Sequence, residues 1–425
     1  MNRSAPSRAF WRRFSARHWL ESPLHQQQPR VPFQLTPDEL FAALVAASEA
    51  SQGGSASGLV RFYIGDALVP DTSYLPARTD GSLDAYVERL ERLLQGRKFG
   101  LIVNAIQGHS FALWSRLREF LHGFYQATGV PPYVAEAGIF FGNYESTAFG
   151  VHQDQVDVMM FVLRGRKTMR FWEPTALELP EVVRHRHAYQ PLLSRSTSAR
   201  AEAGDFVYWP AGHWHVGESE GLSLTLNVAL GTRGGTAANP TPMMSPAEVV
   251  ASAVRGVLSA RMPPSSAVQQ RGSELALAGS KPVPLAKSLR AAVKMLRESM
   301  RDGELECRLL AADLSRQTGF GFQPIPSLLP SRTISHEDVV RGDERYPILW
   351  ARAGDKLVLS ANGRALTTSF QPVVVRVLKR LNQGLPVPVS AFVRQRRPVS
   401  EAVIPLLEHL YRCRAISLAE PSLRE

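Results

Sequence analysis

The sequence predicts a mixed α+β protein in which a β-rich barrel or sandwich is flanked by helices. Between Pro132 and Thr232, short apolar or alternating runs are separated by Gly, Pro and Asn/Asp turns, a pattern typical of β-strands. About a hundred residues with so many short strands are best accommodated by two packed sheets or a closed barrel. Outside this stretch, apolar residues recur at helical spacing.

This helical spacing predicts helices on both sides of the β-rich stretch. Pro37 stands at a permitted first-turn position, and acidic residues follow it. Residues 262–285 are rich in Pro, Ser, Gly and Gln, which is typical of a loop or linker. The expected helices cover residues 37–49, 81–97, 110–127, 245–261 and 286–316.

The C-terminal part of the chain predicts a small α/β module of winged-helix type. Asn362-Gly363 lies between two strand-like runs and is a strong signal for a two-residue hairpin turn. Two helical segments follow it, at 372–383 and 400–417. We therefore expect three parts: a barrel-containing domain at 1–235 with its core at 130–232, a helical linker region at 236–335, and a winged-helix-like domain at 336–425.

The composition is that of a globular protein with a substantial core, at 44% hydrophobic and 20% charged residues. No uninterrupted apolar run reaches roughly 18 residues, so no transmembrane helix is expected. The two cysteines, Cys307 and Cys413, lack any CxxC-type partner, so neither a disulfide framework nor a thiolate zinc site is indicated. These features favour a reducing, cytoplasmic setting without a membrane.

The chain is basic, with 49 Lys and Arg against 38 Asp and Glu and a formal net charge of +11. An excess of this kind favours association with nucleic acid, ribonucleoprotein or acidic peptides. The alternative explanation is an Arg-rich composition without a functional cause. Nucleic acid is therefore a candidate partner on charge alone.

The main chemical signal is Val151-His152-Gln153-Asp154, at the start of a strand-like run. Residues two apart in a strand share a face, so His152 and Asp154 would direct an imidazole nitrogen and a carboxylate oxygen to one point. Two histidines and one carboxylate suit Fe(II) and leave positions open for a cosubstrate and O2. A second histidine is therefore expected elsewhere in the β-rich stretch.

That histidine is expected in the segment from Gly204 to His215. A Gly-Asp turn leads into an apolar strand, and a Pro-x-Gly turn then delivers a histidine. His213 and His215 are two residues apart and could both face inward, so spacing alone does not choose between them. An isolated HxD is a weak signal, but HxD followed by GDxxxxPxGxxH within β-patterned sequence predicts a metal site.

The order of these motifs resembles the Jumonji-C branch of the cupin oxygenases. HxD, a lysine fifteen residues beyond its histidine, and GDxxYxPxGxxH carry the resemblance, and FWRRFSARHWLESP is similar to the opening of these enzymes. Within the branch, the chain is most similar to the ribosomal oxygenases, which combine a catalytic barrel, a helical dimerisation region and a C-terminal winged helix. The resemblance implies a double-stranded β-helix of cupin or jelly-roll type, a homodimer, and the use of Fe(II), 2-oxoglutarate and O2.

Carried over residue by residue, the resemblance implies that His152, Asp154 and His215 are the iron ligands. His215 is favoured over His213 because it ends the PxGxxH pattern.

The resemblance also implies residues for the cosubstrate. Lys167 falls where the family binds the distal carboxylate of 2-oxoglutarate, and a buried dicarboxylate needs a fixed cation. Arg166 is expected on the opposite face of the strand. Asn227 matches a position where relatives place a polar residue near the cosubstrate. Tyr144 is a candidate for the pocket wall, with structural packing as the alternative.

The chain departs from the family at one position of the expected pocket. Three residues before the first metal histidine, some relatives carry a small hydroxyl residue, whereas this chain has Phe149. Thr147 could replace that hydroxyl only through a register shift. His185 and His187 lie in a polar insertion and are expected to be surface residues or substrate contacts.

The resemblance predicts a hydroxylase that couples decarboxylation of 2-oxoglutarate to succinate with oxidation of a protein or peptide side chain. A ribosomal protein and a ribosomally made natural-product precursor peptide are both substrate candidates. One rival function is a winged-helix nucleic-acid-binding regulator with a ligand-sensing cupin domain. Another is a non-catalytic cupin used as a structural module.

Overall fold

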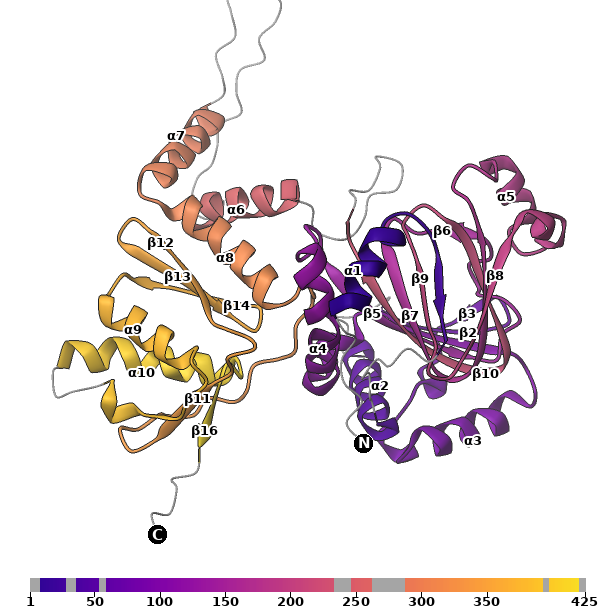
Figure 1. Ribbon diagram of the computed structural model, residues 1–425, viewed down its shortest axis with the longest axis horizontal. Helices are drawn as coiled ribbons and strands as arrows, with labels where there is room; N and C mark the ends of the chain where they lie inside the picture. The colour runs from indigo at the N-terminus through magenta and orange to yellow at the C-terminus, as the bar shows by residue number, and fades with distance from the viewer. Residues whose placement is uncertain are drawn as a thin grey trace, which may run out of the picture. The chain divides into compact units, whose positions relative to one another are not determined.

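The computed structural model describes residues 8–27, 36–52, 59–232, 246–261, 287–392 and 397–419. The chain forms two compact units (Figure 1): residues 1–243 with 320–327, and residues 244–319 with 328–425. The predicted linker at 262–285 lies outside the described residues, and the predicted three-part division stays a prediction. Among the described helices, none has the length and apolar character needed to cross a membrane.

A 10-stranded antiparallel sheet forms the centre of the first unit. Its strand order is β1-β9-β7-β10-β5-β4-β2-β3, with β6 paired to β10 and β8 paired to β7. The β-rich stretch predicted at 132–232 supplies β5 to β10. The strands are β1 (Leu24–Gln26), β2 (Val60–Ile64), β3 (Ala67–Val69), β4 (Phe99–Val103), β5 (Ala135–Gly142), β6 (His152–Gln153), β7 (Asp157–Trp172), β8 (Thr197–Glu202), β9 (Phe206–Trp209) and β10 (Trp214–Leu230).

Helices that precede the β-rich stretch in sequence pack on one face of this sheet. Helix α4 begins after Ser110, whose hydroxyl accepts a hydrogen bond from the amide of Leu113 at 3.2 Å, as is usual for an N-cap. The ring of Trp11 in α1 is buried 5.2 Å from that of Phe120 in α4, so the N-terminal aromatic segment belongs to the core. The α-helices described in this unit are α1 (Arg8–Arg17), α2 (Pro37–Gln52), α3 (Leu83–Leu94), α4 (Phe111–Thr128) and α5 (Leu179–His185).

The strand register gives the sheet two chemically different faces. Phe141 of β5 is paired with Leu224 of β10, and both are buried in the apolar core shared with the helices. The neighbouring pair, Phe140 and Thr225, must point to the opposite face because side chains alternate along a strand. Phe140 and Thr225 line a cavity on that face. One face therefore supplies the core and the other supplies the candidate site.

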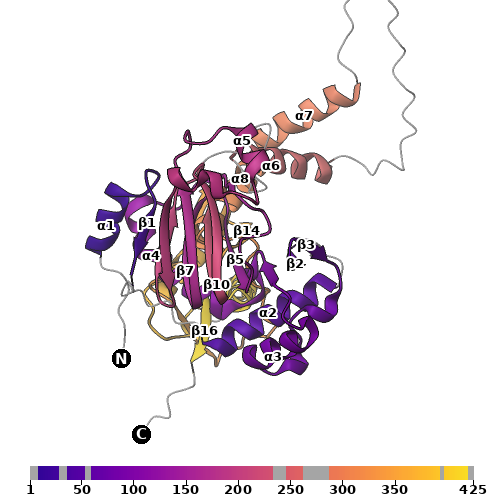
Figure 2. The ribbon, with the colours of Figure 1, turned by 90° about the vertical axis from the view of Figure 1, so that its right-hand side faces the viewer.

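Strands β7 and β10 run side by side and take part in both halves of the fold (Figure 2). Their register shifts between Glu220 and Leu224. Gly165 lies beside this shift with a φ of 72°, and a Cβ atom there would be 2.1 Å from the Leu222 carbonyl oxygen, so glycine is required. On one side of the shift, β10 pairs with β5 and β7 pairs with β9. On the other side, β10 pairs with β6 and β7 pairs with β8. Residues from both halves line the same cavity, an arrangement that agrees with the predicted cupin-like fold.

The second unit has its own apolar core, around α9, α10 and two three-stranded sheets of order β12-β13-β14 and β15-β11-β16. The predicted hairpin is confirmed: Asn362 and Gly363 join β13 to β14 and have positive φ values of 49° and 75°. The winged-helix assignment stays a prediction. The elements are α6 (Pro246–Arg261), α7 (Lys287–Arg301), α8 (Glu304–Thr318), β11 (Val339–Gly342), β12 (Leu349–Ala353), β13 (Lys356–Ala361), β14 (Arg364–Ser369), α9 (Pro372–Leu381), β15 (Val387–Pro388), α10 (Arg397–Arg412) and β16 (Ile416–Ala419).

Two sequence-based expectations for this unit are wrong in detail. The single helix expected at 286–316 is two helices, α7 and α8, because Gly303 between them adopts a φ of 75°. The last helical segment ends at Arg412, and the apolar residues that follow form β16, which pairs with β11. Four residues are too few for periodicity to distinguish a strand from the end of a helix.

Candidate metal centre and adjoining cavity

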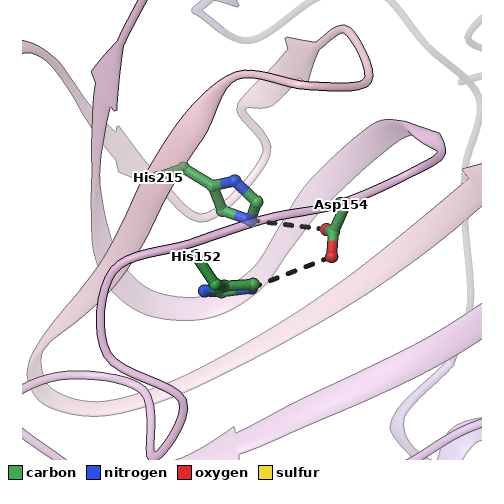
Figure 3. Close-up of side chains that lie close together, drawn as sticks. All are labelled: His152, Asp154 and His215. Atoms are coloured by element: carbon green, nitrogen blue, oxygen red, sulfur yellow. Dashed lines mark ion pairs between the residues drawn. The ribbon is translucent and has the colours of Figure 1, made fainter. Parts of the chain in front are cut away.

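Three side chains that could hold a metal ion converge where β6 meets β10 (Figure 3). The register places His152 directly opposite His215, and their ring centroids are 4.2 Å apart. Asp154 follows β6, with its two oxygens 3.8 Å from His152 Nε2 and 3.4 Å from His215 Nε2. The three ligand atoms lie within 4.8 Å of one another, so one ion could contact all three.

Backbone carbonyls hold both imidazole rings in the form that a metal requires. His152 Nδ1 lies 2.8 Å from the Gly150 oxygen, and His215 Nδ1 lies 3.0 Å from the His213 oxygen. A carbonyl oxygen only accepts hydrogen bonds, so each Nδ1 carries the proton and each Nε2 keeps its lone pair toward Asp154. The two Nε2 atoms are therefore available as ligands.

Burial and mutual electrostatics favour the ligand protonation states. Burial, helped by the neighbouring His215, lowers the pKa of His152 to about 4, so this ring is neutral near pH 7. Burial alone would raise the pKa of Asp154, but the electrostatic effect of the facing histidines, chiefly His215, outweighs it and holds that pKa below its usual value. A neutral imidazole and an ionised carboxylate are the forms that bind a metal.

His213, the other histidine that the spacing allowed, does not belong to the cluster. It precedes β10 and is buried, with Nε2 3.5 Å from a carboxylate oxygen of Glu173. Within the described part of the chain, the metal-ligand cluster includes His215 and not His213. The β6–β10 register therefore resolves the choice, because it pairs His215 and not His213 with His152.

A cavity of about 40 Å³ adjoins the metal cluster and is mostly apolar apart from a few polar groups. Side chains from β5, β7, β9 and β10, together with the turn before β6, form its wall. The cavity is lined by Phe140, Thr147, Phe149, His152, Asp154, Met160, Lys167, Met169, Trp209, His215, Gly217, Thr225 and Asn227.

Lys167 is the buried cation of this cavity, with 2% of its surface exposed. Its Nζ donates hydrogen bonds to Tyr144 Oη at 2.5 Å and to Ser219 Oγ at 3.2 Å, and among the described residues no carboxylate lies within 4.0 Å of it. Burial lowers the pKa of Lys167 to about 7, against a smaller opposing effect of Glu218. Two hydrogen bonds thus hold the amine in place, and an anion bound beside it would favour its charged form.

A glycine on the neighbouring strand β10, Gly217, makes room for the side chain of Lys167. A Cβ atom at Gly217 would lie 2.8 Å from Lys167 Cε and 3.3 Å from Nζ. The neighbouring Arg166 lies on the other face, as expected, with Nε 3.3 Å from Glu202. The strand alternation therefore gives this pair of basic residues two different environments.

Three further polar side chains line the cavity without internal partners. The oxygens of Thr147, Thr225 and Asn227 are buried and, within the described residues, have no hydrogen-bond partner. Buried polar groups are almost always hydrogen-bonded, so these three atoms fit a polar ligand. Asn227 was predicted from the sequence. Thr225 was not, although it shares a strand face with Asn227 two residues away.

The remaining predicted residues take different positions. Tyr144 stands behind Lys167, and burial raises its pKa, so the phenol stays protonated. Phe149 does line the cavity, with its ring 5.5 Å from that of His152. Thr147 nevertheless brings a hydroxyl to the same wall, because the Gly150 amide donates to its carbonyl in a tight turn. His185 and His187, in and after α5, lie outside the cluster.

Comparison with known proteins gives a family match and a fold match. Residues 115–239 match the model of the JmjC domain, and no curated protein matches the sequence. The fold is similar to the ribosomal oxygenase YcfD from Escherichia coli, at 15% identity and a TM-score of 0.51. YcfD in complex with cobalt and 2-oxoglutarate gives 16% identity and a TM-score of 0.50. Both comparisons cover 96% of this chain and 98% of the YcfD chain, and at this identity the likeness concerns the fold.

Proposed function

Since residues 115–239 match the model of the JmjC domain, we propose that this chain is an Fe(II)- and 2-oxoglutarate-dependent oxygenase that hydroxylates a side chain of a protein or peptide. The convergence of His152, Asp154 and His215 beside a cavity with a buried lysine carries the proposal. The overall reaction consumes O2 and 2-oxoglutarate and yields succinate, carbon dioxide and the hydroxylated side chain.

The donor set fits Fe(II), which supplies the activation of oxygen when it is bound. His152, Asp154 and His215 would hold the ion on one side and leave the side toward the cavity open. Fe(II), 2-oxoglutarate and O2 are the cofactors of JmjC oxygenases. YcfD, a structure of similar fold, has been solved with cobalt and 2-oxoglutarate.

The other polar groups of the cavity fit 2-oxoglutarate. Lys167 would pair with the carboxylate that lies farther from the metal, and such a charge-assisted bond is strong in a buried site. Thr147, Thr225 and Asn227 would donate hydrogen bonds to the remaining oxygens, Asn227 through its amide nitrogen. The apolar wall around Phe140 and Trp209 would exclude water from the reacting groups.

A polypeptide side chain is the substrate that these features favour. A protein or peptide substrate would present one side chain on the side of the metal site that the three ligands leave open. The comparison structure is named a ribosomal oxygenase, which favours a ribosomal protein as the target. A ribosomally made precursor peptide is the second candidate. We place the reaction in the cytoplasm.

Mass analysis of the product tests this function. The purified full chain would be incubated with Fe(II), 2-oxoglutarate and air, once with host ribosomal proteins and once with host peptides. A one-oxygen mass gain on a single species, with succinate release that stops under nitrogen or with a chelator, is the expected result. Succinate release that is unchanged by oxygen removal and by chelation would refute the oxygenase.

We also propose that the chain pairs with a second copy of itself through the α6–α8 region. Leu289, Val293 and Met300 of α7 are 54%, 40% and 69% exposed and recur at helical spacing, which leaves an apolar stripe in contact with water. Sedimentation velocity at micromolar concentration is expected to give a dimer. A monomer at that concentration would contradict the proposal.

A further inference from the structure

A second cavity, of about 260 Å³, lies in the second unit, and the proposed reaction does not use it. It is formed by the segment before β11 and by one face of α10, on which its residues recur three, four and seven positions apart. The Leu329 amide donates to the Arg412 carbonyl at 2.9 Å, which ties this segment to the end of α10. The cavity is lined by Ser331, Arg332, Thr333, Pro405, Glu408, His409 and Arg412.

Two guanidinium groups of this cavity have unused hydrogen-bonding capacity. Arg412 Nε is buried and, among the described residues, has no hydrogen-bond partner. The ion pair of Arg332 with Asp338 is long, at 4.0 Å, and Arg332 is half exposed. Guanidinium groups present their N–H donors in a planar fork that matches phosphate oxygens. Both arginines can therefore bind an external anion.

The cavity has two further titratable groups, His409 and Glu408, of which only Glu408 can carry a negative charge. Burial, followed by the charge of Arg412, lowers the pKa of His409, so this ring is neutral near pH 7. Glu408 is the one acid in the lining, and its Oε1 accepts a hydrogen bond from the Ile334 amide at 3.3 Å. Arg364 and Arg414 add positive charge nearby, since both act on Cys413 beside the cavity.

We propose that this cavity binds a phosphate group of a nucleic-acid strand. Arg332 and Arg412 would contact the phosphate oxygens, and the hydroxyls of Ser331 and Thr333 are further donors in the lining. A polyanion is favoured over a free phosphate because residues 328–425 contain 15 Lys and Arg against 9 Asp and Glu, more than half of the excess positive charge of the chain. The site lies outside the proposed active site, so either assignment can fail without the other.

Fluorescence anisotropy of the full chain with a labelled single-stranded RNA of mixed sequence tests the proposal. Arg332→Gln and Arg412→Gln are each expected to weaken binding about tenfold and to reduce the salt slope by about one. Arg376→Gln removes the same charge from an exposed position on α9 outside the cavity and is expected to change affinity less than about twofold.

Glu408→Gln keeps an acceptor for the Ile334 amide and removes the opposing charge, so it is expected to tighten RNA binding about two- to fivefold. Misfolding would weaken RNA binding and cannot tighten it. A gain of affinity would therefore show that the charge of the cavity, and not a loss of structure, controls binding. Thermal melting and succinate formation are expected to be unchanged in all four variants.

Three outcomes would overturn the assignment. The first is an Arg376→Gln effect as large as that of Arg412→Gln, which would indicate diffuse attraction over the whole unit. The second is unchanged or weaker binding by Glu408→Gln. The third is that the protein binds inorganic phosphate in calorimetry but does not bind RNA. Free phosphate would then be the ligand.

Discussion

Replacing His215 by alanine is expected to abolish iron binding and succinate formation. Replacing His213 by alanine is expected to leave iron binding and succinate formation unchanged. His215 Nε2 lies 3.4 Å from Asp154 and faces His152 across the β6–β10 pair. His213 is equally buried but lies outside the cluster, near Glu173. Losing a group that only orients a ligand already lowers metal affinity about 10- to 100-fold, so losing a ligand itself is expected to cost more than about 100-fold.

Anaerobic titration with Co(II), followed by its visible absorption, measures this difference without any substrate. The wild type and His213→Ala are expected to give the same affinity and the same spectrum, and His215→Ala no saturable binding. The two variants remove identical side chains two residues apart, so a general effect of losing a buried histidine is controlled. If His215→Ala still binds the metal and His213→Ala does not, then His213 and not His215 is the metal ligand.

This pair also marks the limit of what the sequence predicts about the site. Spacing within one strand places His152 and Asp154 on the same face without any knowledge of the fold. Which residue faces them from another strand depends on register, and register is set by the packing of the whole sheet. The β6–β10 pairing supplies this information and selects His215.

The same distinction explains the cavity residues. Lys167 and Asn227 were predicted from the resemblance to a family, and both line the cavity. Thr225 was not predicted, because a threonine in a strand is common. What sets it apart is that its buried hydroxyl has no hydrogen-bond partner among the described residues, and this is visible only in the structure. Thr147 reaches the cavity through a turn whose geometry has no signature in the spacing of side chains.

In the fold, the apolar periodicity of α4 predicted its ends better than the short apolar run of β16 predicted its structure. The apolar stripe of α4 extends over eighteen residues, and the helix was expected within one or two residues of its observed ends. β16 has only four residues, and it forms a strand because its backbone pairs with the edge of β11. Such pairing depends on tertiary structure, which local spacing does not encode.

Replacing Lys167 by methionine is expected to weaken 2-oxoglutarate binding by about 2–5 kcal/mol, or roughly thirtyfold or more in Kd. Lys167 is buried, and among the described residues it has no carboxylate within ion-pair distance, so an acid bound in the cavity would be its charged partner. Calorimetric titration of the metal-loaded protein under nitrogen measures the loss. Arg166→Met is the matched control, because Arg166 points away from the cavity toward Glu202.

Folding is not expected to suffer from Lys167→Met. Replacing an uncompensated buried charge by an apolar side chain of similar length is neutral or stabilising. The melting temperature is therefore expected to stay the same or to rise while the affinity for 2-oxoglutarate falls. Gly217→Ala provides an independent check, since its Cβ atom would lie 2.8 Å from Lys167 Cε and displace the amine, so it is also expected to weaken 2-oxoglutarate binding.

The pH dependence of binding follows from the pKa of Lys167, which burial lowers to about 7. Below pH 7 the free protein already carries the charged amine, so the acid binds without taking up a proton. Above pH 7 the amine is neutral in the free protein but charged in the complex, because the bound carboxylate raises its pKa. Binding then requires a proton, and the Kd for 2-oxoglutarate is expected to rise by up to about tenfold per pH unit. If the Kd is flat between pH 6.5 and about 8.5, or rises equally in Lys167→Met, then a group other than Lys167 binds the carboxylate of 2-oxoglutarate.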